Sequence, residues 1–252
     1  EVIIHLAAQP GVRIGLDGRK KYVEQNISAF LEIIALTNKL DIKTLVYASS
    51  SSVYGANTAP PFKEDQESLN PTSIYGITKL SNELLAKVAF TNQISRTRGL
   101  RFFSVYGPAG RPDMAYFRAA YSSICHKKFS QFGDGKVLRD YTYIDDVVES
   151  IIKLSYELDT RQPGFHDVVN VGGGTPIALN LLIRRIEEII GQKIDLEVKP
   201  GYLEDLKETM ADFSYLRSLI GKREFCNFET GIERTVKWFL NIPKDKIEMW
   251  SK

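Results

Sequence analysis

The strongest constraint on the fold is an alternation of β-rich runs with longer amphipathic segments. Three β-rich runs, at 1–8, 43–49 and 100–105, are separated by segments with helical periodicity at 17–40 and 73–91. Strands that alternate with helices are typical of βαβ units, in which parallel strands are joined by right-handed crossovers. The pattern therefore predicts an α/β fold built on a parallel sheet.

The pattern changes after Gly107-Pro108, and we predict a domain boundary there. Residues 1–108 form the first domain, and 109–252 form a smaller α/β domain. Its predicted helices lie at 113–127, 144–158, 178–190 and 229–240, and its strands at 129–132, 139–143, 167–172 and 194–199. The segment 167–173 can instead return to the main sheet, and the sequence leaves both arrangements open.

Composition excludes several classes of function. The net charge of +2 is too small to indicate nucleic acid or a membrane surface as a partner, and no run approaches the ~18 apolar residues that span a bilayer. Two distant cysteines, Cys125 and Cys226, argue against a disulfide framework and favour the cytoplasm. His5, His126 and His166 are scattered, so we predict no metal site.

The run ASSSSVYG, residues 48–55, follows a strand of the type that is buried on both faces. Serine clusters usually mark loops. In open parallel sheets, however, ligands bind beyond the carboxyl ends of the strands, where serine hydroxyls donate and accept hydrogen bonds. On this run alone, a loop and a site remain equally open.

Tyr75 and Lys79 share one face of the helix predicted at 73–91, for which Ser73 is a candidate N-cap. A nearby cation favours the phenolate and so lowers the pKa of tyrosine, which is about 10 in the free residue. The two side chains together suit acid–base catalysis, with a serine hydroxyl completing the proton path. Such a pair is common on surface helices, but a serine-rich strand end 25 positions upstream favours a catalytic role for it.

At these residues the chain resembles the extended short-chain dehydrogenase/reductases, and among them the nucleotide-sugar epimerases. The resemblance covers almost the whole chain, because its motifs follow in the order of that family. They are HLAAQPGV, LVYASSSSVYG, PTSIYGITKLSNE, LRFFSVYGPAGRPDMA, GKVLRDYTYIDDVV, VVNVGGG, LEDLKETMAD and GIERTVKWF. It implies a Rossmann-like, doubly wound parallel sheet that binds NAD, and a smaller domain, mainly 109–252, that binds a nucleotide sugar.

The run YGPAGRPDMA is most similar to the UDP-glucuronate 4-epimerases. Arg111 within it offers a planar fork suited to a carboxylate, although pairing with Asp113 is an equally open reading of the run alone. The glycine-rich dinucleotide fingerprint is absent, and the chain starts at Glu1 inside an apolar run. Gly172-Gly173-Gly174 lies too late to replace it. We therefore expect an N-terminal fragment with about two βαβ units to be missing.

The resemblance implies a mechanism and a set of site residues. Tyr75, as phenolate, takes the proton of the sugar 4-hydroxyl while the hydride leaves C4 for NAD; Lys79 lowers the Tyr75 pKa and binds the nicotinamide ribose, and Ser50 is the catalytic hydroxyl. The 4-keto sugar turns over and is reduced on its other face, giving UDP-galacturonate. The implied cofactor contacts are Ala7, Ala8, Gln9, Asn26, Ala48, Ser49, Tyr75, Lys79 and Phe102. The implied substrate contacts are Ser51, Ser52, Ser104, Arg111 and Arg139, the last for the diphosphate.

Asp140, Asp145 and Asp146 read instead as structural or helix-start groups. By resemblance, the helices at 17–40 and 73–91 pair with their copies in a homodimer. Two alternatives stay open. One is a UDP-glucose 4-epimerase, a UDP-glucuronate decarboxylase or a dehydratase, although Ser51-Ser52 offers no acid pair for dehydration. The other is a non-catalytic domain that binds sugar nucleotides.

Overall fold

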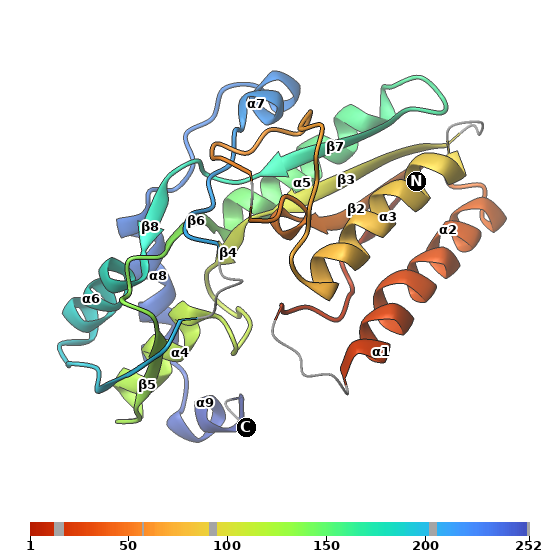
Figure 1. Ribbon diagram of the computed structural model, residues 1–252. Helices are drawn as coiled ribbons and strands as arrows, with labels where there is room; N and C mark the ends of the chain where they lie inside the picture. Colours follow the sequence, from red (N-terminus) through yellow and green to blue (C-terminus); the bar gives the residue numbers. More distant parts are fainter. Residues whose placement is uncertain (13–17, 57, 91–94, 202–205, 251–252) are drawn as a thin grey trace. The chain divides into compact units, whose positions relative to one another are not determined.

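The computed structural model describes the chain except for residues 13–17, 57, 91–94, 202–205 and 251–252 (Figure 1). The chain divides into two compact units. Unit 1 comprises Glu1–Phe103, Val148–Gly172 and Ala211–Arg223, and unit 2 comprises Ser104–Val147, Gly173–Met210 and Glu224–Lys252. No helix among the described residues is both long and apolar enough to cross a bilayer.

Unit 1 is built on a parallel sheet with the strand order β1-β2-β3-β7. These strands are β1 (Val2–His5), β2 (Thr44–Ser50), β3 (Arg96–Phe102) and β7 (His166–Val171). Ser50 pairs with Phe102, and Phe102 pairs with Val171, so the carboxyl ends of β2, β3 and β7 are in register. The sheet therefore offers one edge at which loop residues from several strands meet.

One face of the sheet is covered by helices from the first half of the chain. The segment α1 (Arg19–Tyr22), η2 (Val23–Ser28) and α2 (Ala29–Lys39) is helical throughout, with a π-helical turn at η2. Together with α3 (Ile74–Phe90), it buries apolar side chains against β2. Figure 1 shows the ribbons of α2 and α3 beside the sheet. Phe30 and Phe90 pack there with Leu45 and Tyr47.

The other face is covered by α5 (Ile144–Asp159). Thr44 precedes Leu45 in β2, so its side chain points to the opposite face of the sheet. There its hydroxyl donates to Asp159 at the end of α5 (2.7 Å). Arg98 on β3 donates from Nη1 to the carbonyl oxygen of Leu154 on α5 (3.1 Å). Helices on both faces of a parallel sheet confirm the predicted α/β, Rossmann-like fold.

The predicted helices match the structure closely, although residues 17 and 91 of two of them lie outside the described residues. Ser73 caps α3, because its hydroxyl accepts from the Gly76 N–H (3.0 Å). The predicted strand at 100–105 is wrong as a single element. The chain leaves the main sheet after Phe102, and Ser104–Tyr106 forms β4 of a second sheet. Periodicity also missed the start of β3, because Thr97 and Arg98 are polar yet fully buried.

The described residues of unit 2 form two small sheets, four complete helices and the first turn of α5. In one sheet β6 pairs with β4 in parallel and with β8 in antiparallel orientation; in the other, β5 pairs with β9. The strands are β4, β5 (Phe129–Phe132), β6 (Leu138–Tyr143), β8 (Pro176–Ala178) and β9 (Leu196–Lys199). The helices are α4 (Ala115–Ile124), α6 (Leu179–Ile190), α8 (Phe228–Leu240) and α9 (Lys244–Trp250). Leu182, Ile183 and Ile186 place the predicted apolar stripe of α6 in the core.

The sequence left the place of 167–173 open, and the structure pairs β7 with β3 in the main sheet. Two further segments, α5 from Val148 onward and α7 (Ser214–Ile220), also belong to unit 1. Sequence periodicity missed β8, α7 and α9, because each has no more than seven residues, about two helical turns or less. The binding roles assigned to 1–108 and 109–252 stay predictions.

Candidate active site

The serine run is the end of a buried strand followed by one tight turn. β2 ends at Ser50, which is extended, and η3 (Ser51–Val53) follows at once. The Ser50 hydroxyl accepts the Ser52 N–H (3.2 Å), so its own hydrogen can be donated to another oxygen. Ser49 points to the opposite face, where its hydroxyl donates to Glu83 on α3 (2.5 Å). The run is therefore a fixed structure and not a linker.

Tyr75 and Lys79 lie one turn apart on α3, as predicted, and the structure brings them together. The Lys79 Nζ atom lies 5.9 Å from the centroid of the Tyr75 ring. It also donates to the carbonyl oxygen of Ala48 (2.8 Å), two residues before Ser50. This bond joins the helix that carries Tyr75 to the serine end of β2.

Lys79 is only 2% exposed, and no carboxylate of the described residues forms an ion pair with it. Burial lowers the pKa of Lys79 from 10.5 to about 8. The side chain therefore stays mainly protonated at neutral pH. A buried ammonium with three N–H donors retains hydrogen-bonding capacity beyond its bond to Ala48.

Gly76, which follows Tyr75, sets how closely α3 approaches the serine turn. A Cβ atom at this position would lie 2.5 Å from the backbone oxygen of Ser52 and 2.9 Å from Cβ of Pro71. Only glycine fits here without moving the helix. Sequence reasoning missed this role, although a glycine inside a helix is a signal for close packing.

Asn26 lies in the π-helical turn η2 and holds the loop after β1. Its Oδ1 accepts from the Gln9 N–H (2.7 Å), and its Nδ2 donates to the Gln9 carbonyl (3.1 Å) and to the Thr78 hydroxyl (3.0 Å). Thr78 in turn donates to the carbonyl oxygen of Tyr75 (2.8 Å). Asn26 thus ties the predicted cofactor loop to α3, and π-helical turns are frequent at functional sites.

The other predicted cofactor contacts surround this edge of unit 1. Ala7 is exposed, Ala8 and Gln9 are half-buried, and all three follow β1. Ala48 and Phe102 are half-buried at the ends of β2 and β3. Their contact with a cofactor stays a prediction.

The predicted substrate contacts fall on both units. Ser51 and Ser52 form η3 in unit 1, whereas Ser104, Arg111 and Arg139 belong to unit 2. Arg111 is exposed, and its guanidinium forms a bidentate pair with Asp113 (3.0 and 2.5 Å), which is the alternative reading of this residue. Contact of these five residues with a substrate stays a prediction.

Arg139 and Asp140 are held by the loops around β6. The Arg139 Nη1 donates to the carbonyl oxygens of Leu138 (2.9 Å) and Leu206 (2.7 Å). The buried Asp140 carboxylate accepts the N–H groups of Gly173 and Gly174 (both 2.9 Å). These bonds fix the glycine run, which is a structural role of the kind predicted for Asp140.

Asp145 and Asp146 lie in the first turn of α5, as expected of helix-start residues. Asp146 also accepts the backbone N–H of Cys226 (2.8 Å). Within the described parts of the chain, no group of three His, Cys, Asp or Glu side chains is placed to hold a metal ion.

The chain matches the family described as NAD dependent epimerase/dehydratase over residues 1–172. It is 38% identical over 248 residues to the UDP-glucuronate 4-epimerase of Thermodesulfobacterium geofontis, covering 98% of this chain and 73% of that protein. It is 37% identical over 254 residues to the probable UDP-glucuronate 4-epimerase of Rhizobium meliloti, covering 95% of this chain and 74% of that protein.

A solved structure shares the fold. The UDP-glucuronic acid 4-epimerase of Bacillus cereus, in complex with UDP-glucuronic acid and NAD, superposes with a TM-score of 0.85 at 33% identity. The match covers 95% of this chain and 75% of that one. These findings confirm the resemblance that the sequence motifs indicated.

Proposed function

Because the chain belongs to the NAD dependent epimerase/dehydratase family, we propose that it interconverts UDP-glucuronate and UDP-galacturonate by inverting C4 of the sugar. The observation that carries this proposal is the Tyr75–Lys79 pair, fixed beside the serine end of β2. The sugar acid is chosen because relatives at 37–38% identity bear the name UDP-glucuronate 4-epimerase.

The residues of unit 1 fit NAD as the cofactor. The buried Lys79 ammonium, without an ion-pair partner among the described residues, lies at the edge where parallel sheets bind nucleotides. It suits the hydroxyls of the nicotinamide ribose, and Ala7, Ala8, Gln9, Ala48 and Phe102 would line the rest. NAD, when bound, would supply the two-electron redox chemistry at C4 of the sugar.

The chain's own residues handle the proton. The Tyr75 phenolate takes the proton of the sugar 4-hydroxyl, and Lys79 keeps a positive charge nearby that favours the phenolate. The Ser50 hydroxyl donates to the same oxygen, for which its hydrogen remains available. When the sugar has turned over, Tyr75 returns the proton to the 4-oxygen of the epimer. Proton transfer is thus balanced over one turnover.

Unit 2 supplies substrate recognition in this proposal. Arg111 binds the sugar carboxylate, which either replaces Asp113 as the partner of the guanidinium or joins it. Arg139 binds the diphosphate, whose negative charges suit a cationic partner. Ser104 of unit 2 contacts the sugar, and so do Ser51 and Ser52, which belong to unit 1.

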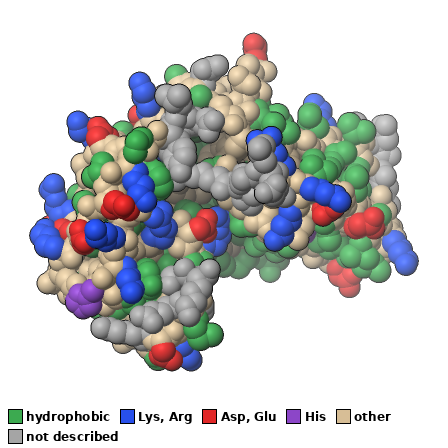
Figure 2. Space-filling view, turned by 60° about the horizontal axis from the view of Figure 1, so that its bottom comes forward, with side chains coloured by type: hydrophobic (Ala, Val, Ile, Leu, Met, Phe, Trp, Pro, Cys, Tyr) green, Lys and Arg blue, Asp and Glu red, His purple; other side chains and the backbone are tan. Residues whose placement is uncertain are grey.

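We also propose a homodimer that forms through α2 and α3. Leu31 on α2 and Ile77, Leu84 and Val88 on α3 are 45%, 50%, 57% and 79% exposed. The three residues on α3 share one face, because they are seven and four positions apart. Figure 2 shows apolar side chains exposed between charged ones on the surface of the molecule. Burying such a face is the expected use of apolar helix surfaces. Cys125 and Cys226 form no disulfide in the described parts of the chain, which supports the expected cytoplasmic location.

The test is conversion of UDP-glucuronate by the complete protein, with the product identified by chromatography. We expect UDP-galacturonate, and we expect Tyr75→Phe to abolish its formation. A UDP-pentose with release of carbon dioxide would instead identify a decarboxylase. If the protein retains no NAD and Tyr75→Phe changes nothing measurable, the chain is a binding module.

A further inference from the structure

A second polar link between α3 and the sheet involves a residue that the proposed reaction does not use. Glu83 lies one turn after Lys79 and two turns after Tyr75, so the three residues follow one another along the same side of α3. It is only 5% exposed. A buried carboxylate needs a partner, because burial of an unpaired charge is strongly unfavourable.

That partner is Arg101 on β3, which is 3% exposed. Its Nε donates to Glu83 Oε1 (2.9 Å) and its Nη2 to Oε2 (2.8 Å), which gives a bidentate pair. The Ser49 hydroxyl donates to Oε1 as well (2.5 Å). Glu83 therefore joins α3 to β3 and to the residue that precedes the predicted catalytic Ser50.

Arg101 continues the network to the other side of the serine turn. Its Nη1 donates to the Tyr54 hydroxyl (2.9 Å), and its guanidinium lies 4.8 Å from the centroid of the Tyr54 ring. Tyr54 donates in turn to Asn170 on β7 (2.7 Å). The network therefore contacts the chain on both sides of Ser50, at Ser49 and at Tyr54.

We propose that Glu83 and Arg101 are positioning residues, whose buried pair sets Tyr75 and Lys79 against Ser50. This inference rests on the proposed function. A buried ion pair stabilises a fold no better than a well-packed apolar pair of similar volume, so stability alone does not explain it. A bidentate fork does fix one orientation of its partners. Lys79 lies between this anchor and the close contact at Gly76, and Tyr75 directly precedes Gly76.

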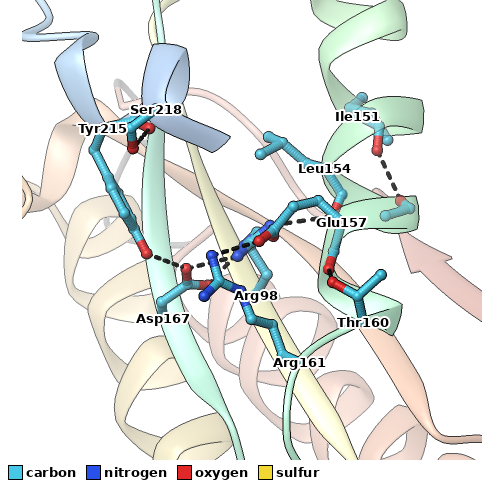
Figure 3. Close-up of polar contacts among 10 residues, drawn as sticks. Arg98, Ile151, Leu154, Glu157, Thr160, Arg161, Asp167, Tyr215 and Ser218 are labelled. Carbon is cyan, nitrogen blue, oxygen red and sulfur yellow. Dashed lines mark hydrogen bonds and ion pairs between the residues drawn. The ribbon is translucent and has the colours of Figure 1, made fainter. Parts of the chain in front are cut away.

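The same strand holds a matched control (Figure 3). Arg98 is fully buried and forms a bidentate pair with Asp167 (2.7 and 2.8 Å), which also accepts from the Tyr215 hydroxyl (2.7 Å). Arg98 lies three residues from Arg101, so it faces the opposite side of the sheet, where it contacts Glu157 of α5 (2.6 Å). This pair has the chemistry of the Glu83 pair, and none of the contacts described for it reaches α3 or the serine turn.

The experiment compares Glu83→Gln with Asp167→Asn in the complete protein. Each substitution removes one carboxylate charge from a buried bidentate pair. We expect both to lower stability, but only Glu83→Gln to lower kcat, by about 10²-fold with little change in KM, as a displacement near 1 Å can do. Equal effects on kcat from the two variants would overturn the proposal.

Two milder substitutions test the proposal if Glu83→Gln or Asp167→Asn does not fold. Tyr54→Phe removes one hydroxyl from the Arg101 network, and Tyr215→Phe removes one from the Arg98 network. We expect only Tyr54→Phe to lower kcat. If Tyr215→Phe lowers kcat as much, the network at Arg101 has no special role.

A measurement without turnover separates this inference from the proposed function. The pKa of Lys79, measured by NMR of its labelled side chain, reports how closely α3 is held against β2. Loosening α3 in Glu83→Gln should hydrate Lys79 and move its pKa from about 8 toward 10.5, while Asp167→Asn leaves it unchanged. An unchanged Lys79 pKa in Glu83→Gln would refute positioning, even if the wild-type protein catalyses no epimerisation.

Discussion

Substituting Gly76 by alanine tests whether the close approach of α3 to the serine turn matters for catalysis. The added Cβ would lie 2.5 Å from the Ser52 backbone oxygen, whereas ordinary contact needs about 3.5 Å. Because a backbone oxygen cannot rotate away, the first turn of α3 must retreat by about 1 Å. Tyr75 is the neighbouring residue and must move with it.

Two opposing terms set the effect on stability. Alanine favours a helix over glycine by about 1 kcal/mol, whereas overpacking costs about 1–3 kcal/mol. We expect a net loss of up to about 2 kcal/mol, which for a chain of this size lowers the Tm by at most about 4–8 °C. A displacement of about 1 Å should lower kcat by about 10²-fold.

The assays are calorimetric unfolding and turnover of UDP-glucuronate, with Ser81→Ala as the control. Ser81 lies on the same helix, and its hydroxyl donates only to the Ile77 carbonyl within the helix in the bonds described (2.9 Å). Alanine there should leave kcat unchanged. A Gly76→Ala protein with a raised Tm and normal kcat would show that the helix does not need this close contact.

Three further predictions concern charge and assembly. Between pH 8 and 10.5 the unfolded chain holds a proton at Lys79 that the folded chain has lost, so the free energy of unfolding should rise with pH by up to about 3 kcal/mol relative to Lys79→Met. The same pH dependence of this free energy in the two proteins, measured by urea denaturation, would contradict the prediction. Arg111→Ala should weaken binding of UDP-glucuronate by about 1.5–3 kcal/mol in calorimetry, and equal losses for neutral UDP-hexoses would refute its role at the carboxylate. Leu84→Glu should shift the protein from dimer to monomer in sedimentation, because it buries a charge in the proposed interface, and a wild-type monomer would exclude the dimer.

Much of the fold followed from periodicity. The helices at 73–91, 144–158 and 178–190 were predicted within two residues of their observed ends, where the ends are described, because each has a long apolar stripe. Short elements such as β8 and α7 carry too few residues for a period to emerge. The division of 100–105 between β3 and β4 could not be predicted for another reason. Both halves are β-rich, and they differ only in the strands with which they pair.

The candidate site was predictable where it depends on spacing along the chain. Tyr75 and Lys79 share a helix, and Ser50 ends a strand, so local geometry places their side chains. The contacts of Asn26 with Gln9 and Thr78 were not predictable, because they join residues up to 52 positions apart. The same applies to Glu83 and Arg101, which lie 18 positions apart on a helix and a strand.

The sequence by itself determined the order of the longer strands and helices, the serine end of β2 and the pairing of Tyr75 with Lys79, because each depends on short-range periodicity. Only the tertiary structure decided that Ser49 and Ser50 face opposite ways toward different partners, and that Lys79 is buried with a lowered pKa. It also decided that Gly76 touches the serine turn and that two arginines of one strand are buried on opposite faces of the sheet. Burial and hydrogen bonding between distant segments set these features, and neither leaves a period in the sequence.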